Sequence, residues 1–444
     1  MSKNPEILGR ARIGLLLWKY SIPAIVGTLV NAAYNIIDRI FIGHGVGPMA
    51  ISGLAITFPV MMLAGGFGLL IGAGGAALVS IRLGERNMRQ AEQILANCII
   101  LNVVISLLFT FFGLWFLDDI LRIFGGSEVT IPYAREFLEV ILSGTLVTSL
   151  LFSMNNIMRA SGHPNKAMIT LLISTAINLV LAPLFIFVFH WGIRGAAIAT
   201  LISQTISAVW VVAHFFDHRN FLHFRKEQFV LDRRIIGGIL AIGSSPFLLH
   251  VAASVVQALM NNGLGHYGGD EAIGAFGIFN SVLVLFVFFV LGLTQGMQPI
   301  AGYNYGAGKM TRVRELFRLT VLVATLITTT GFLAGMLFPG PIARLFTNDA
   351  AMVAIAERGL RITVLLFPFV GYQIVTSNLF MAIGKARIAI FLTLSRQVLF
   401  LIPALLILPG MFGLDGVFMA TPVSDSIAVV ITTLVLATQL KKLR

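Results

Sequence analysis

A stripe of polar residues interrupts the apolar stretch from residue 22 to residue 41, and these residues could do chemistry. The stripe consists of Asn31, Tyr34, Asn35 and Asp38. Their spacing of i, i+3, i+4 and i+7 places them on one face of a helix. A carboxylate inside a membrane span is costly and usually serves ion or proton transfer. Asp38 is therefore predicted to bind a proton or a cation; the alternative is a carboxylate at a helix end that is wetted by the outer surface or held by a structural partner.

Other polar side chains in apolar stretches are candidates for lining a substrate cavity. Beside Asn31, they are Asn155 and Asn156 in the first half of the chain, and Gln257, Asn261, Asn262 and Asn280 in the second half. Each alone is more typical of a hydrogen bond between helices than of a ligand contact. As a set, they predict a polar cavity.

Arg396 and Asp425 form a second candidate charge site, because both lie deep in late apolar stretches. An unpaired charge in lipid is costly, so two opposite charges there are expected to pair. We expect an ion pair in the interior of the protein. If the two residues are apart, Asp425 becomes a second candidate proton site.

The composition of the chain indicates that these polar residues lie in a protein whose solvent is lipid. Of its 444 residues, 57% are hydrophobic and 11% are charged, and the mean hydropathy is +0.92. A soluble globular chain is about a quarter charged. The net charge of +12 does not indicate nucleic acid binding, because the basic residues lie in loops between apolar runs.

Apolar runs long enough to cross a bilayer are predicted twelve times. They cover residues 14–42, 51–80, 93–117, 132–160, 166–190, 193–216, 235–264, 272–303, 316–339, 351–382, 387–409 and 414–439. Counted by loop, 23 Lys and Arg fall on the side of both termini and six on the other side. The positive-inside rule therefore places both termini in the cytoplasm and the multi-pass chain in the cell inner membrane.

The second half of the chain repeats the first. Pro23 matches Pro246, and the segment 192–200 matches 413–421. We therefore predict an all-α integral membrane protein of twelve transmembrane helices, in two six-helix bundles related by a pseudo-two-fold axis along the membrane normal. The expected units are residues 1–216, a cytoplasmic linker at 217–234, and residues 235–444.

Motifs of common enzymes and cofactor sites are missing. No G-x-x-x-x-G-K-[ST] sequence is present for ATP phosphates, and no nucleophile, base and orienting residue can be nominated together. The single cysteine, Cys98, excludes an intrachain disulfide and a cysteine-based zinc site. The chain is therefore not expected to be an enzyme, and no cofactor is predicted.

The whole chain resembles the multidrug and toxic compound extrusion (MATE) family, closest to its MepA-type, DinF-like bacterial branch. The resemblance is carried by the two six-span halves and by short motifs: Pro23 with Tyr34-x-x-x-Asp38, Arg159-Ala-x-Gly162, residues 302–308 (GYNYGAG), Ser395-Arg396-Gln397, and Asn261-Asn262 with residues 267–274.

The resemblance implies export of amphipathic, cationic compounds in exchange for H⁺ or Na⁺ by alternating access. In DinF-like members, a coupling carboxylate in span 1 works with Asn-x-x-x-Asp in span 5 and Ala-x-x-x-Thr in span 6. By that resemblance, the ion-coupling residues here are Asp38, Tyr34, Asn178 and Thr200, and a sodium ion would use Asp38, Asn178, Ala196 and Thr200. Position 182 is alanine where the second acid would be, which favours a proton.

A flippase for a lipid-linked substrate is the main alternative on the same architecture. Its cavity would need several cationic side chains to bind pyrophosphate, and the spans hold almost none beyond Arg39 and Arg396. The expected partners are therefore small amphipathic molecules, H⁺ or Na⁺, and membrane lipids. The protein is expected to be a monomer.

Overall fold

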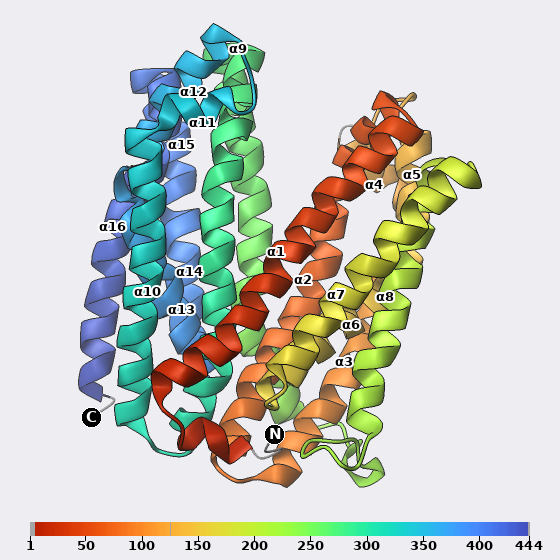
Figure 1. The fold of residues 1–444 in the computed structure, drawn as a ribbon, viewed down its shortest axis with the longest axis vertical. Coiled ribbons are helices and arrows are strands. Elements are labelled where there is room, and N and C mark those ends of the chain that lie inside the picture. The colour runs from red at the N-terminus through yellow and green to blue at the C-terminus, as the bar shows by residue number, and fades with distance from the viewer. Residues whose placement is uncertain (1–4, 125, 443–444) are drawn as a thin grey trace.

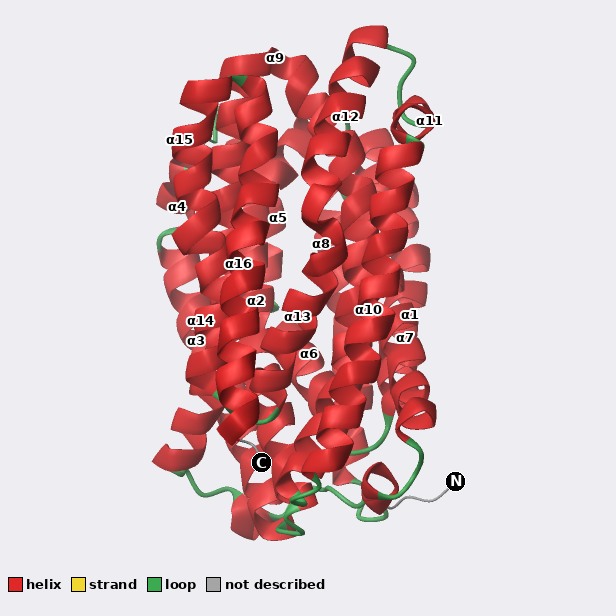
Figure 2. Cartoon of the chain, turned by 90° about the vertical axis from the view of Figure 1, so that its left-hand side faces the viewer, coloured by secondary structure: helices red, strands yellow, loops and turns green. Residues whose placement is uncertain are grey.

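The computed structural model describes residues 5–124 and 126–442, and these ranges contain helices and loops but no strand (Figure 1, Figure 2). In lipid, apolar runs become helices because a helix satisfies its own backbone hydrogen bonds. The elements are η1 Pro5–Gly9, α1 Ile13–Gly45, α2 Pro48–Gly84, α3 Met88–Trp115, α4 Leu117–Ile123, α5 Ile131–Ser143, α6 Thr145–Ala160, α7 Pro164–Pro183, η2 Leu184–Val188, α8 Gly192–Phe216, η3 Lys226–Gln228, α9 Arg233–Gly306, α10 Met310–Leu337, α11 Pro339–Arg344, α12 Ala350–Thr363, η4 Val364–Leu366, α13 Phe367–Ala382, α14 Ala386–Leu394, η5 Ser395–Leu401, α15 Ile402–Phe412 and α16 Leu414–Lys442.

Among the described residues, ten helices are long and apolar enough to cross a membrane, and the bent pair α5–α6, with a 54° break, raises this number to eleven. α9 contains two of these spans, divided near Gly269, where the backbone is not helical. The tenth expected span, 351–382, is divided into α12 and α13 by η4. The fourth span of each half is thus interrupted, near Gly144 in the first half and at η4 in the second.

The turns between helices repeat along the chain at a spacing of 221 or 222 residues. Positive φ angles occur at four repeat-related pairs: Gly47 and Gly269, Arg86 and Gly308, Gly162 and Gly384, and Gly192 and Gly413. The backbone therefore carries the duplication that is visible in the sequence. Figure 1 shows the two helix groups joined at the end that holds both termini and splayed apart at the opposite end.

The two halves make backbone contact where α2 crosses the end of α9. A Cβ on Gly84 would lie 2.0 Å from the carbonyl oxygen of Tyr303, and a Cβ on Gly306 would lie 2.1 Å from that of Ile81. Ile81 and Gly84 are the repeat counterparts of Tyr303 and Gly306, so each half makes the same contact with the other. Such reciprocal contacts are what a two-fold axis produces.

A second close crossing joins α2 to the beginning of α9. A Cβ on Gly243 would lie 1.7 Å from the carbonyl oxygen of Leu70, and a Cβ on Gly74 would lie 2.1 Å from that of Ile239. Small residues allow helix backbones to approach this closely in membranes, where packing rather than the hydrophobic effect drives association. The two crossings fix the halves against each other.

The end that holds the termini is also fastened by side chains at the junction of α9 and α10. Asn304 Nδ2 donates to the carbonyl of Leu8 at 2.9 Å, and Arg312 Nη2 donates to the same oxygen at 3.3 Å. Lys309 Nζ donates to the carbonyl of Gly9 at 2.8 Å. The second half therefore holds η1, the first element of the first half.

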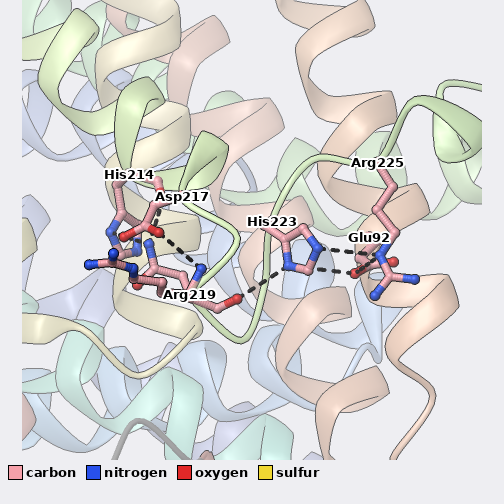
Figure 3. Close-up of polar contacts among 7 residues, drawn as sticks. Glu92, His214, Asp217, Arg219, His223 and Arg225 are labelled. Atoms are coloured by element: carbon pink, nitrogen blue, oxygen red, sulfur yellow. Dashed lines mark hydrogen bonds and ion pairs between the residues drawn. The ribbon is translucent and has the colours of Figure 1, made fainter.

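The segment between the halves docks on α3 (Figure 3). Glu92 Oε1 lies 3.0 Å from Arg225 Nε and 4.0 Å from His223 Nδ1. Farther along α3, Asn97 Nδ2 donates to the carbonyl of Val230 at 3.0 Å. This segment is therefore bound to the first half up to the start of α9.

Gly243→Ala tests the α2–α9 crossing. The added Cβ would meet a backbone carbonyl that cannot turn aside, so we expect a loss of about 1–3 kcal/mol or more of stability, seen as a lower midpoint in thermal denaturation followed by size-exclusion chromatography. Gly237→Ala on the same helix is the matched control, because no atom lies within 4 Å of its added Cβ. Equal midpoints for the two variants would contradict this packing.

Candidate functional site

Side chains from α1, α7 and α8 meet inside the first half. The hydroxyls of Tyr34 and Thr200 lie 2.9 Å apart, and Asn178 Nδ2 donates to Thr200 Oγ1 at 3.2 Å. Asn178 and Thr200 are buried, whereas Tyr34 is partly buried. The structure thus brings together three of the four residues predicted for ion coupling, with the Thr200 hydroxyl shared between the other two.

Asp38 lies one helical turn beyond Tyr34 on α1. It is partly buried, and its Oδ1 is buried without a hydrogen-bond partner. The neighbouring Arg39 is exposed, with its guanidinium carbon 5.5 Å from the ring centre of Phe58. A buried carboxylate oxygen without a donor is costly, and a proton or a cation would relieve that cost. The side chain of Asn35, the remaining stripe residue, lies outside the described part of the structure.

The residues around this site fit a sodium ion poorly. Ala182 is fully buried among apolar side chains that include Phe185 and Ala199. Ala196 is fully buried in another apolar cluster. Neither alanine supplies a side-chain oxygen, whereas hard cations such as sodium favour several oxygen ligands. The predicted sodium set therefore offers side-chain oxygens only from Asp38, Asn178 and Thr200.

A small pocket opens beside Tyr34 in the interior of the first half. Helices α1, α6, α7 and α8 surround it, and its lining is Asn31, Tyr34, Leu151, Phe152, Leu171, Ser174, Thr175, Ser203 and Gln204. Gln204 also accepts a hydrogen bond from Thr148 Oγ1 at 2.6 Å. Asn31 is thus the one predicted cavity residue that lies in this pocket.

The two asparagines of α6 do not line the pocket and bond to backbone carbonyls. Asn155 is buried, and its Nδ2 donates to the carbonyl of Ala167 on α7 at 2.7 Å. Asn156 Nδ2 donates to the carbonyl of Phe152 on its own helix at 2.8 Å. Asn155 therefore holds α6 against α7, and Asn156 adds a bond within α6.

The four cavity candidates of the second half lie on α9. Gln257 Nε2 donates to Asn261 Oδ1 at 3.0 Å, and both residues are exposed. Asn262 is also exposed, and Asn280 is partly buried. None of the four lines the pocket beside Tyr34, so the predicted cavity residues belong to separate places in the structure.

The expected ion pair of the second half is present between η5 and α16. Arg396 Nε contacts Asp425 Oδ1, and Asp425 is 2% exposed. Gln373 Nε2 donates to the carbonyl of Asp425 at 3.0 Å, and Ser424 Oγ donates to that of Arg396 at 2.8 Å. The carboxylate of the second half is therefore already paired, in contrast to Asp38.

Arg159 is a buried link between the halves that the sequence did not reveal. The charge pattern of the sequence places Arg159 among the basic residues of the loop after the fourth span, but the structure leaves it 7% exposed. Its Nη1 donates to Gln295 Oε1 in the second half, and its Nη2 donates to Asn155 Oδ1 at 3.3 Å. Its position in the motif Arg159-Ala-x-Gly162 was the one available signal.

Thr200→Val tests the shared hydroxyl. The substitution keeps the shape of the side chain but leaves the Tyr34 hydroxyl and the Asn178 amide without that partner, so we expect a cost of about 1–3 kcal/mol. Thermal denaturation should show a lower midpoint. Thr205→Val is the control, because Thr205 is exposed and bonds only to the carbonyl of Leu201 on its own helix. Identical midpoints would refute the network.

Asp425→Leu and the double variant Arg396→Met/Asp425→Leu test the ion pair. The single substitution leaves an unpaired cation in the bundle and should cost about 3–5 kcal/mol, whereas removal of both charges should cost less. The same denaturation assay measures both variants. A double variant less stable than the single one would show that pairing does not set the cost.

Comparisons with known proteins agree with this architecture. The MatE family model matches residues 23–184 and 246–406, one segment in each half. The multidrug export protein MepA of Staphylococcus haemolyticus is 27% identical over 408 residues, which cover 92% of this chain and 90% of that protein. MepA of Staphylococcus aureus is 26% identical over 416 residues, covering 94% and 92%.

Solved structures share the fold. An outward-facing multidrug resistance MATE family transporter of the MOP superfamily matches with a TM-score of 0.93 and 24% identity, covering 100% of this chain and 99% of that one. A MATE protein in a bent conformation matches with a TM-score of 0.94 and 23% identity, covering 100% and 98%. With the family model matched in both halves, the chain belongs to the MATE (MatE) family of multi-pass membrane transporters.

Proposed function

We propose that this protein is an antiporter that exports amphipathic, cationic compounds in exchange for H⁺ rather than Na⁺. Asp38 carries the proposal, because its buried Oδ1 lacks a hydrogen-bond partner and it lies one helical turn from the bonded group of Tyr34, Thr200 and Asn178. Family membership supports transport, and the MepA relatives are named multidrug export proteins. An ionised Asp38 would attract a cationic substrate, and a proton on Asp38 would remove that attraction.

The few side-chain oxygen atoms near Asp38 favour a proton over a sodium ion. One carboxylate and the neutral Asn178 and Thr200 side chains provide few oxygen atoms, and the buried Ala182 adds none. A proton needs a single oxygen atom, whereas a dehydrated sodium ion needs several. The observed set therefore suits protonation of Asp38.

Residues 1–216 and 235–444 are proposed as two units, joined by the linker 217–234, that rock against each other. Hydrogen bonds between the halves gather at the end of the termini, where Arg159 meets Gln295 and Lys309 meets Gly9. The opposite ends splay apart (Figure 1). With the termini in the cytoplasm of the inner membrane, as the basic loops predict, this arrangement corresponds to an outward-facing state of a monomer.

In the proposed cycle, a proton from outside binds Asp38 and the substrate leaves. The neutral carboxyl tolerates apolar surroundings, so α1 can pack inward and the halves can rock. Loss of the proton toward the cytoplasm restores the charge, and a new cationic substrate binds. Asn31, Asn156, Gln257, Asn261, Asn262 and Asn280 are proposed to contact substrates along this path, and Asn155 to hold the wall in place.

A flippase for a lipid-linked substrate is less well supported. A pyrophosphate group would need unpaired cations in the cavity. Arg396 is paired with Asp425, Arg159 bonds to two amides, and Arg39 lies over Phe58. The intramembrane arginines are thus already engaged.

The deciding experiment measures ethidium export from proteoliposomes under an imposed pH gradient and, separately, under a sodium gradient. Wild-type protein should respond to the proton gradient, and Asp38→Asn should lose that response while remaining folded. Asp119→Asn, at an exposed acid outside the spans, is the matched control.

Gradient-driven export by Asp38→Asn would refute the role of Asp38. A response of wild-type protein to sodium alone would refute proton coupling. Movement of a labelled lipid-linked sugar without ethidium export would favour the flippase.

A further inference from the structure

The polar residues of the first half form three successive layers along its interior. Asp38 lies outermost, one turn beyond Tyr34 on α1. The middle layer is the bonded group of Tyr34, Thr200 and Asn178. The third layer is the pocket, whose polar lining is Asn31 and Tyr34 on α1, Ser174 and Thr175 on α7, and Ser203 and Gln204 on α8.

Helix geometry places the pocket one turn closer to the termini than the middle layer. Asn31 precedes Tyr34 on α1, and Thr175 precedes Asn178 on α7, each by three residues. α8 runs in the opposite direction, so Ser203, three residues after Thr200, lies on the same side. On all three helices, the pocket residue therefore lies on the side of the bonded group that faces the termini.

The pocket has an apolar floor. Leu171 lies one turn before Thr175 on α7, and its Cδ1 is 2.9 Å from the position of a Cβ on Gly27 of α1. Gly27 itself lies one turn before Asn31. Leu171 packed against α1 therefore closes the pocket toward the termini in this conformation.

The chemistry of the lining selects a small neutral occupant. Hydroxyl and amide groups alternate with Leu151, Phe152 and Leu171, and no Asp, Glu, Lys, Arg or His is among the lining residues. A bare ion in such a site would lack a compensating charge. The space suits a molecule of water size, and several polar partners are what a buried water requires.

We propose that the pocket binds water and relays the coupling proton from Asp38 toward the termini, an inference that rests on the proposed proton coupling. Asp38 gives up its proton and ends as a carboxylate. The Tyr34 hydroxyl, one turn from Asp38 and part of the pocket lining, accepts one proton and releases its own to the pocket water, so it ends unchanged. The pocket water accepts that proton and releases one of its own toward the termini as Leu171 moves away from α1, so it also ends unchanged and no ion remains in the pocket.

Radiolytic hydroxyl labelling of the full-length protein in lipid nanodiscs, read by mass spectrometry, tests occupancy, because aromatic side chains beside bound water become oxidised. Tyr34 and Phe152 should be labelled in wild-type protein. Thr175→Leu fills the pocket and should reduce that labelling several-fold, whereas Thr205→Leu, at an exposed position on α8, should not. Unlabelled Tyr34 and Phe152 in wild-type protein, or equal labelling in both variants, would overturn the proposal.

The relay is tested with Gln204→Leu, which replaces a polar side chain of the pocket lining with an apolar one of similar size. The rate of proton entry during ethidium export, followed with a pH dye inside the vesicles, should fall several-fold. The Kd for ethidium should stay at the wild-type value. Unchanged proton entry would overturn the relay. Labelling of Tyr34 and Phe152 does not depend on transport. If these residues are labelled in a wild-type protein that shows no proton-driven export, the proposed function is refuted and the water-filled pocket is not.

Discussion

The backbone contact of α2 with α9 is the constraint on which the rest of the structure depends. At Gly84 and Gly306, and again at Gly74 and Gly243, the chain leaves no room for a side chain between the helices. In lipid, such close packing replaces the hydrophobic effect as the force that holds helices together. The two halves are therefore joined along this seam, and α1 adds a further close contact with α9, where a Cβ on Gly292 would lie 2.6 Å from the Cα of Ile25.

That seam explains how one duplicated framework can carry two different interiors. In the second half, Asp425 is paired with Arg396, and neighbouring side chains bond to the backbone of both residues. In the first half, Asp38 has a buried oxygen without a partner. The duplication preserved the turns and the crossings, whereas the charged side chains diverged. The two halves therefore differ in electrostatics: the buried carboxylate of the second half is paired with an arginine, whereas Asp38 keeps a buried oxygen without a hydrogen-bond partner.

Arg159 and the junction of α9 and α10 show how the seam is reinforced at one end. Both donate hydrogen bonds across the halves, mostly to neutral acceptors such as Gln295 and the carbonyl of Leu8. Because the donors Arg159 and Arg312 are ionised, their bonds are charge-assisted and stronger than bonds between two neutral groups. They therefore strengthen the contact between the halves at the end that holds the termini.

The helical membrane fold, the duplication and the polar stripe with Asp38 could all be predicted from the sequence. Hydropathy and repeat spacing depend only on the order of residues along the chain. The pairing of Arg396 with Asp425 could also be predicted, because an unpaired charge in lipid has a high free-energy cost. The sequence did not show the division of residues 351–382, the burial of Arg159 or the pocket beyond Thr200. These features were decided by the tertiary structure, because they depend on which helix faces meet, and the spacing along one helix does not encode the side chains of its neighbours.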